Sequence, residues 1–473
     1  MAICKLGLNT KVQAASVNVT VSDLHPLIKL GQTIPWEKIS EIVIPDLEKT
    51  TKGMFFVGRK LKLRVHLAVY ILQKIYDKTD RQIEWEIKDN GSYQLFCGAG
   101  ILRKFSVPDH TNISKFRSRL SPETQRSLAN HIVVMATKLG FADAIAMDID
   151  STIQEANMSY PSDVSIMKKM VIKAARIWQC LKEGISDFGD FETEVEVGKI
   201  KGLAKHYHLR AKTVSEKSKA ISKLYRAYYW EIMGVIHHFT FLGSLKFELP
   251  HWIQRDIDHV VENFEKFSRD VASYICYGKR EKGKIFSLHL KEVDCFNKGR
   301  LGKPLQYGRN FQLGRISGNF MIAGKSDTVR MEDRANLKTM VEEHRKLFGE
   351  GTMKSFSTDR GYFSKENFDY LTRTMMFSFN LPKPGRRKKP VTMEHWKKMN
   401  MLQDRQKGIE ALIGQIKQGG QLGRSRMKSD MSTLAAGYGA VLGFNLRQLI
   451  RHQLGKKIKP MFKRSTTMEC PVY

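Results

Sequence analysis

The sequence predicts an α/β protein, in which a mixed sheet is flanked by helices and accompanied by a mainly helical N-terminal domain and a helical insertion. Three patterns predict this class. Residues 144–152 (AIAMDIDST) alternate short apolar residues and end in carboxylates, as a core strand with an exposed acidic end does. Residues 252–275 repeat apolar residues at helical spacing. Short β-like runs return between residues 284 and 328.

The order of these patterns divides the 473-residue chain into four parts. Residues 1–30 are weakly patterned and are treated as an N-terminal arm, and residues 31–140 are expected to form a mainly helical domain. Residues 141–452 hold the strand-like runs and are interrupted by a helical insertion at about 163–278. Residues 453–473 are expected to form a basic C-terminal tail.

Two helices are expected in the N-terminal domain. Residues 61–76 (LKLRVHLAVYILQKIY) place apolar residues at helical spacing with basic residues interspersed. A second helix is expected to begin at Ser121, because serine is a favoured N-cap and Pro122 suits the first helical position.

The stretch between these helices, residues 109–120 (DHTNISKFRSRL), combines basic side chains with hydroxyl and amide groups. This composition suits contacts to DNA phosphates, although it also fits a solvated helix face. Its candidate DNA-binding residues are Lys115, Arg117 and Arg119.

Strands and helices are also expected in the second half of the chain. Two helices are predicted at about residues 402–418 and 430–452. The strand-like runs are IFSLHL (285–290), LQYGRNFQL (305–313), GNFMIAG (318–324) and KSFSTD (354–359).

The chain carries far more positive than negative charge. Lysine and arginine total 79, aspartate and glutamate total 48, and the formal net charge is +31. A protein this basic needs a polyanionic partner, and nucleic acid is the leading one because each neutralised phosphate releases a counterion. A ribosome-associated or membrane-surface protein is the alternative. The basic runs outside the tail are Arg386, Arg387, Lys388 and Lys389, and Arg424, Arg426 and Lys428.

Other classes of protein are disfavoured. The six cysteines form no CxxC pair, so the sequence indicates neither a zinc knuckle nor a redox motif. No stretch reaches the roughly 18 apolar residues of a membrane span, so no membrane partner is expected. Residues 323–326 (AGKS) lack the glycine that a phosphate-binding loop requires five residues before Gly324, so no nucleotide cofactor is expected.

Three acidic residues occupy positions that suit divalent metal ions. Asp150 and Asp359 each end a strand-like run, and Glu410 lies on a helix with lysines at helical spacing on either side. Phosphodiester cleavage is commonly done by two metal ions held by carboxylate oxygens. Asp148 is an alternative first acid, because alternate residues of a strand share a face. Asp150 is preferred because it directly precedes a Ser-Thr pair.

Several sequence blocks occur in a characteristic order over roughly residues 35–455. They are LRVHLAVYILQKIYDKTDRQI (63–83), DHTNISKFRSRL (109–120), DST (150–152), EANMSYPSD (155–163), GKPLQYGRNFQL (302–313), TDRGYFSKENFDYL (358–371) and RQKGIEALIGQIKQGGQLGRSRMKSD (405–430). In this order they resemble the DDE transposases of bacterial insertion sequences, within the RNase H-like superfamily.

The resemblance implies an RNase H-like catalytic core in which Asp150, Asp359 and Glu410 form a triad that holds two Mg²⁺ or Mn²⁺ ions. It implies that Lys417, seven residues after the glutamate, contacts DNA near the active site. The implied partners are double-stranded DNA, as terminal inverted repeats and as target, and a second copy of the chain in a dimer or larger assembly. The implied location is the bacterial cytoplasm, at the nucleoid.

Some interpretations stay open. A DNA-binding protein without activity, or an RNase H-like nuclease that cuts without strand transfer, would carry much of the same pattern. Arg405 does not fall at the family's arginine position, which Gln406 occupies. Tyr362 and Trp396 are candidates for stacking on an extruded base, with core packing as the alternative.

Overall fold

The computed structural model divides the chain into two compact units, which are described separately. The first comprises Met1–Thr152, Asn310–Gly423 and Leu434–Tyr473, and the second comprises Ile153–Arg309 and Arg424–Thr433. No described helix is long and apolar enough to cross a membrane. The residues that the structure describes are 21–49, 62–100, 105–184, 194–244, 249–297, 302, 304–326, 330–374, 378–385, 393–457 and 461.

The first unit begins with short helices that share one apolar core. The helix predicted at residues 61–76 is confirmed as α3, whose buried residues include Leu67, Val69 and Leu72. A reciprocal capping box between Thr79 and Gln82 starts α4. These helices are α1 (Pro26–Thr33), α2 (Trp36–Lys49), α3 (Leu63–Tyr76), α4 (Asp80–Asp89), α5 (Gly91–Phe96) and α6 (His110–Arg119).

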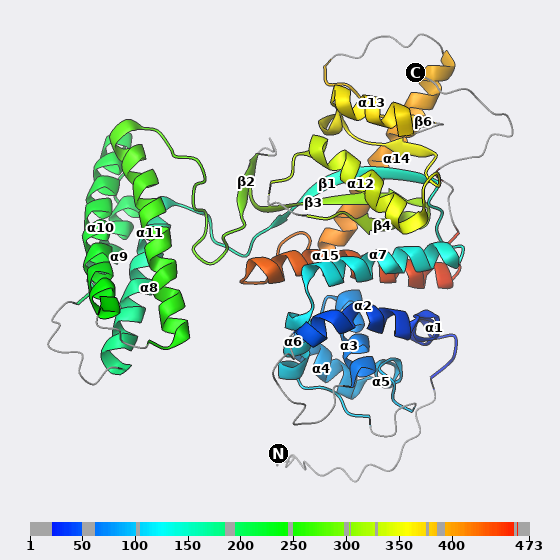
Figure 1. Ribbon diagram of the computed structural model, residues 1–473, viewed down its shortest axis with the longest axis horizontal. Helices are drawn as coiled ribbons and strands as arrows, with labels where there is room; N and C mark the ends of the chain where they lie inside the picture. Colours follow the sequence, from blue (N-terminus) through cyan, green and yellow to red (C-terminus); the bar gives the residue numbers. More distant parts are fainter. Residues whose placement is uncertain are drawn as a thin grey trace, which may run out of the picture. The chain divides into compact units, whose positions relative to one another are not determined.

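Helix α7 (Pro122–Lys138) begins where the sequence predicts. The Ser121 side chain accepts a hydrogen bond from the backbone N–H of Thr124, and Pro122 occupies the first turn. The helix then runs along the sheet, where the buried Arg126 pairs with Glu343 at 2.7 Å. In Figure 1, α7 and α15 (Asp430–Gln453) run below the strands and α13 (Lys365–Thr374) lies above them, whereas α12 (Asp333–Phe348) overlaps the strands in this view.

The described strands form a mixed six-stranded sheet, so the predicted α/β class is confirmed. Their order is β2-β3-β1-β5-β6, and β4 also pairs with β3. The β1–β5 and β5–β6 pairs are parallel, whereas β2 and β4 run antiparallel to β3. The strands are β1 (Ala146–Glu155), β2 (Asp294–Asn297), β3 (Leu305–Ile316), β4 (Phe320–Ala323), β5 (Ser355–Ser357) and β6 (Ser378–Asn380).

Two buried asparagines satisfy the outer edge of β4. Asn130 of α7 accepts from the backbone N–H of Ala323 at 2.8 Å and donates to its carbonyl at 3.1 Å. Asn445 of α15 does the same at Met321, at 2.9 Å and 2.8 Å. Because an unpaired sheet edge leaves backbone groups exposed or unsatisfied, these side chains replace the missing strand.

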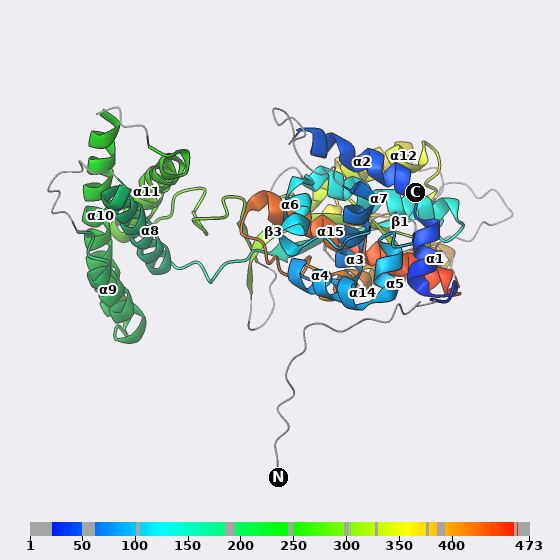
Figure 2. The same ribbon diagram turned by 90° about the horizontal axis from the view of Figure 1, so that it is seen from below.

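Four helices of the second unit occupy the predicted insertion: α8 (Asp163–Gly184), α9 (Val197–Leu209), α10 (Val214–Ser244) and α11 (His251–Tyr277). Figure 2 shows them side by side. Their apolar faces form a core of their own around residues such as Trp178, Tyr228 and Phe267. Arg280 follows α11 and pairs with the buried carboxylates of Asp163 and Asp270.

The strand predicted at residues 285–290 is wrong. This segment has no strand, and Ile285 and Leu288 pack against the helical core. The Ser287 hydroxyl accepts from the backbone N–H groups of His289 and Leu290, at 3.4 Å and 3.3 Å. Such local side-chain bonds compete with a β-ladder for the same donors.

One buried histidine makes the stability of the first unit depend on pH. His344 of α12 is fully buried, and its Nε2 donates to the carbonyl of Ala144 at 2.8 Å, while its Nδ1 has no partner. Burial lowers the pKa of His344 from 6.5 to about 4. Between pH 6.5 and pH 4, His344 is therefore protonated in the unfolded chain but neutral in the folded chain. The free energy of unfolding falls as the pH falls through this range.

We expect His344 to remove about 2 kcal/mol from the free energy of unfolding between pH 7 and pH 5. Urea unfolding at both pH values measures this loss. The His344→Gln variant keeps a side-chain donor without a titrating ring, so its pH dependence should be weaker by that amount. Equal pH dependence in the two proteins would contradict the prediction.

Candidate active site

The three predicted acids lie on three different elements of the first unit. Asp150 lies in β1, and its Oδ1 accepts from the Ser151 N–H at 2.7 Å. Asp359 follows β5 and caps the short 3₁₀ helix η2 (Arg360–Tyr362), accepting from the Gly361 N–H at 2.9 Å. Glu410 is exposed on α14 (Met393–Gln418). Asp150 lies within β1 and not at the end of the strand, where the sequence predicts it, because β1 continues to Glu155. The parallel pairing of β1 with β5, with Asp148 opposite Ser357, places Asp150 and Asp359 at the same level along the two strands.

The electrostatics of Asp150 indicate that these acids converge. Burial, the largest cause, and the negative charges of Asp359, Glu410 and Asp333 together raise the pKa of Asp150 to about 7, against the hydrogen bond from Ser151. Like charges disfavour ionisation in this way only at short range. The charges of three other acids therefore act on Asp150, and the sequence analysis anticipated two of these three.

Asp333 is the acid that sequence reasoning missed. It is the first residue of α12, and its Oδ1 accepts from the Gln312 side chain at 3.0 Å. A Cβ placed on Gly361 would lie 3.2 Å from Asp333 Oδ2 and 3.2 Å from Asp359 Oδ1, so both oxygens border the same small space. An acid in the first turn of a helix is an ordinary feature, and the sequence contains no signal that distinguishes this one.

Tyr362 lies beneath the acids rather than at the surface. Its side chain is fully buried and its hydroxyl donates to Gln312 Oε1 at 2.5 Å. Burial raises the pKa of Tyr362 well above its usual range, and the charges of Asp333, Asp150 and Asp359 add to this effect. Stacking of Tyr362 on an extruded base is therefore wrong, and core packing is right. The side chain of Trp396 lies outside the described residues.

The carboxylate oxygens of these acids suit a hard cation, although they do not surround one position on all sides. Among the described residues, no three histidine, cysteine or acidic side chains gather closely enough to hold one ion together. Mg²⁺ is usually bound by one or two carboxylates, with water and substrate phosphates completing its shell. Carboxylate oxygens facing a space that glycine leaves open, as at Gly361, fit that requirement.

Asp148, the alternative first acid, is held in an ion pair. It is completely buried, and its Oδ1 accepts from Arg405 Nε at 2.7 Å. Arg405 also donates to Ser355 Oγ of β5 at 2.8 Å, so this arginine ties α14 to two strands. Arg315 lies 4.0 Å from the other oxygen of Asp148. This arrangement favours Asp150 as the first acid and gives Arg405 a positioning role.

A glycine on α14 allows this cluster to form. Gly408 lies between Arg405 and Glu410, and a Cβ there would come within 2.1 Å of Arg315 Nη1. Arg315 also donates to the Arg405 carbonyl at 3.1 Å and to Asn319 Oδ1 at 2.9 Å. The close approach of this guanidinium to the helix backbone therefore requires glycine.

The predicted DNA-binding residues differ in exposure. Lys115 is exposed on α6, whereas Arg117 pairs with Asp80 at 2.9 Å and Arg119 donates to the Leu47 carbonyl at 2.6 Å. Lys417 is half-buried in the last turn of α14. In the second unit, Arg424, Arg426 and Lys428 are exposed. Arg386, Arg387, Lys388 and Lys389 lie outside the described residues.

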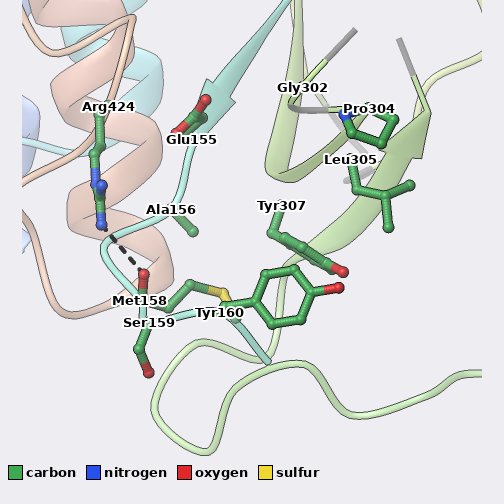
Figure 3. Close-up of a pocket in the computed structure, with 10 residues that line it drawn as sticks. All are labelled: Glu155, Ala156, Met158, Ser159, Tyr160, Gly302, Pro304, Leu305, Tyr307 and Arg424. Carbon is green, nitrogen blue, oxygen red and sulfur yellow. Dashed lines mark hydrogen bonds between the residues drawn. The ribbon is translucent and has the colours of Figure 1, made fainter. Parts of the chain in front are cut away.

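A pocket of about 430 Å³ in the second unit lies beside Arg424 (Figure 3). Arg424 donates to the Met158 carbonyl at 3.2 Å on one side. On the other side the rings of Tyr160 and Tyr307 meet edge to face, with centroids 5.6 Å apart. The pocket is lined by Glu155, Ala156, Met158, Ser159, Tyr160, Gly302, Pro304, Leu305, Tyr307 and Arg424. It was not predicted from the sequence.

We expect loss of the buried pair to destabilise the protein strongly. Arg405→Gln leaves the Asp148 carboxylate buried without its main partner, which typically costs about 3–5 kcal/mol. Urea unfolding measures the cost, and the double variant Asp148→Asn/Arg405→Gln should recover part of it because neither charge remains. Lys407→Gln is the matched control on the same helix, since its pair with Asp404 is exposed. A cost for Arg405→Gln as small as that of the control would exclude the positioning role.

Two comparisons with known proteins bear on the family to which the chain is similar. The family described as "Transposase domain (DUF772)" matches residues 16–119, which include helices α1 to α6. A protein of Rhizobium meliloti described as "Uncharacterized protein ORF8 in nfe locus" is 22% identical over 169 residues, which cover 34% of this chain and 77% of that protein. No solved structure matches. Residues 16–119 are therefore similar to a transposase domain, and the resemblance of the chain to the transposases of bacterial insertion sequences is confirmed.

Proposed function

We propose that this protein is a DDE transposase, which binds the terminal inverted repeats of an insertion sequence and catalyses metal-dependent strand cleavage and strand transfer. The observation that carries the proposal is the electrostatic convergence of Asp150, Asp359 and Glu410 from three distant segments. Acids scattered over a surface would not act together to raise the pKa of Asp150. The transposase-domain match supports the proposal independently of the acids, because it covers another part of the chain.

We infer an RNase H-like catalytic core from the same elements. The mixed sheet with its parallel β1–β5 pair supports this inference, since adjacent parallel strands position two of the acids, Asp150 within β1 and Asp359 just after β5. Helix α14 supplies the third acid and is fixed against β1 and β5 by Arg405.

Each residue then has a distinct role. Two Mg²⁺ or Mn²⁺ ions, when bound, would activate the attacking oxygen and stabilise the leaving oxygen. The carboxylates of Asp150, Asp359 and Glu410 would hold them. Lys417, two turns after Glu410 on α14, would bind a DNA phosphate close to the scissile bond.

The proposed reaction is two successive displacements at phosphorus. In the first, a water oxygen bonds to phosphorus, the bond to the 3′-oxygen breaks, and the strand ends as a 3′-hydroxyl and a 5′-phosphate. In the second, that 3′-hydroxyl attacks a phosphodiester of target DNA, and the displaced target oxygen leaves as a new 3′-hydroxyl. Bonds to phosphorus are exchanged one for one, so neither step needs an oxidant or an energy-carrying nucleotide.

DNA is the proposed partner of the basic residues. Lys115, Arg424, Arg426 and Lys428 are exposed, as contacts to DNA phosphates would require. We propose the same role for Arg386, Arg387, Lys388 and Lys389, and a dimer or larger assembly that would pair two DNA ends in the bacterial cytoplasm. Arg117 and Arg119 remain candidates, although their guanidinium groups already contact Asp80 and Leu47.

We expect Asp150→Asn, Asp359→Asn and Glu410→Gln each to reduce metal-dependent cleavage of a terminal-repeat duplex by roughly 10²-fold or more. Loss of one charge-stabilising group costs about that much in a polar active site. Gel-shift affinity for the same duplex should change little, because phosphate contacts are kept. Asp404→Asn, an exposed acid on the same helix as Glu410, is the control and should cut normally. Normal cleavage by a triad variant would exclude that residue.

A joining assay separates the proposed transposase from the alternatives. The cut 3′ end should appear covalently joined to a second, labelled duplex. Cleavage without joining would indicate a nuclease of the same superfamily, and binding without cleavage by the unaltered chain would indicate an inactive copy.

A further inference from the structure

We propose that Asp333 is a fourth carboxylate of the metal site and shares one divalent cation with Asp359. This inference rests on the proposed function and deepens it, since it names a ligand outside the DDE triad. It starts from the space beside Gly361, where the oxygens of both aspartates meet.

The position of Gly361 defines how close the two carboxylates are. Asp333 Oδ2 and Asp359 Oδ1 each lie 3.2 Å from the point that a Cβ on Gly361 would occupy. A methyl group at that point would be in tight contact with both oxygens. Its absence leaves a small space that both oxygens border, although Asp359 Oδ1 also accepts from the Gly361 N–H at 2.9 Å, and a cation is the species that such a space attracts.

The side chain of Asp333 is oriented by a chain of hydrogen bonds through Gln312 and Tyr362. The buried Tyr362 hydroxyl donates to Gln312 Oε1 at 2.5 Å, and Gln312 Nε2 donates to Asp333 Oδ1 at 3.0 Å. This chain occupies Oδ1 and orients the carboxylate, so that Oδ2 faces the space at Gly361. Hydrogen-bond partners of this kind commonly orient the ligands of metal sites.

The alternative explanation is that Asp333 only stabilises the N-terminus of α12 and binds no metal. It is the first residue of α12, where a negative charge interacts favourably with the helix dipole. The two roles predict opposite effects of neutralisation on the metal-free protein. A helix acid stabilises the fold, so Asp333→Asn would lower the Tm. A carboxylate crowded against Asp359 and Asp150 destabilises the fold when no cation is bound, so Asp333→Asn would leave the Tm unchanged or raise it.

The test titrates Mn²⁺ alone into the full-length protein, by calorimetry and by the Tm with and without the metal. We expect Asp333→Asn to weaken Mn²⁺ binding at least roughly 10-fold, the scale on which metal affinity responds to loss of a site residue. The rise in Tm that Mn²⁺ produces should shrink in proportion, because a ligand stabilises only the form that binds it. Glu342→Gln, an exposed acid on the same helix, is the control and should bind as the wild type does.

A second variant removes no charge. Gly361→Ala fills the space that the two carboxylates border, and the φ of Gly361 is compatible with alanine. The variant should therefore weaken Mn²⁺ binding although both aspartates are intact. Gly202→Ala on α9, where a Cβ meets nothing, is its control. Mn²⁺ binding at wild-type affinity in both Asp333→Asn and Gly361→Ala would overturn the inference, as would a lowered metal-free Tm with unchanged affinity for Asp333→Asn.

Mn²⁺ binding by Asp359→Asn distinguishes failure of the fourth-ligand proposal from failure of the proposed metal site itself. If this variant loses Mn²⁺ while Asp333→Asn retains it, the fourth ligand is excluded and the triad stands. If Asp359→Asn also binds as the wild type does, or if the wild type takes up no Mn²⁺, the metal site itself is excluded.

Discussion

The buried ion pair between Asp148 and Arg405 is the contact on which the geometry of the candidate site depends. It fixes α14 against β1 at a single point. Asp150 is two residues after Asp148 on β1, and Glu410 is five residues after Arg405 on α14. Both acids therefore lie close along the chain to the contact that joins their two elements. An arginine suits this task because its planar group reaches Asp148 and Ser355 at once.

The acids of the candidate site destabilise the fold, because their negative charges repel one another. Four carboxylates near one another repel, and burial makes the repulsion around Asp150 stronger. Each is therefore held by its own element: a strand, a 3₁₀ turn, a helix start and a helix interior. This is how active sites commonly keep unfavourable charge together, since packing elsewhere in the fold offsets the local cost. The large positive charge of the chain further favours anionic ligands around this acidic centre.

Local chemistry explains which parts were predictable. The start of α7 followed from a serine and a proline, and β1 and α14 followed from their apolar spacing. The strand predicted at residues 285–290 failed because Ser287 bonds its own backbone and the neighbouring apolar residues serve the helical core. Strands β2 and β6 are only four and three residues long, too short to show a period. The partnership of Asp333 with Asp359, and that of Arg405 with Asp148, are long-range contacts that no local pattern encodes.

The asparagines that flank β4 also limit how copies of this protein can associate. Asn130 and Asn445 already occupy the hydrogen-bonding positions of Met321 and Ala323 on the outer side of that strand. A neighbouring chain cannot extend the sheet there by strand addition without displacing both helices. Self-association through a continuous intermolecular sheet is therefore blocked at β4, and any assembly that uses this region must contact the outer faces of α7 and α15 through their side chains.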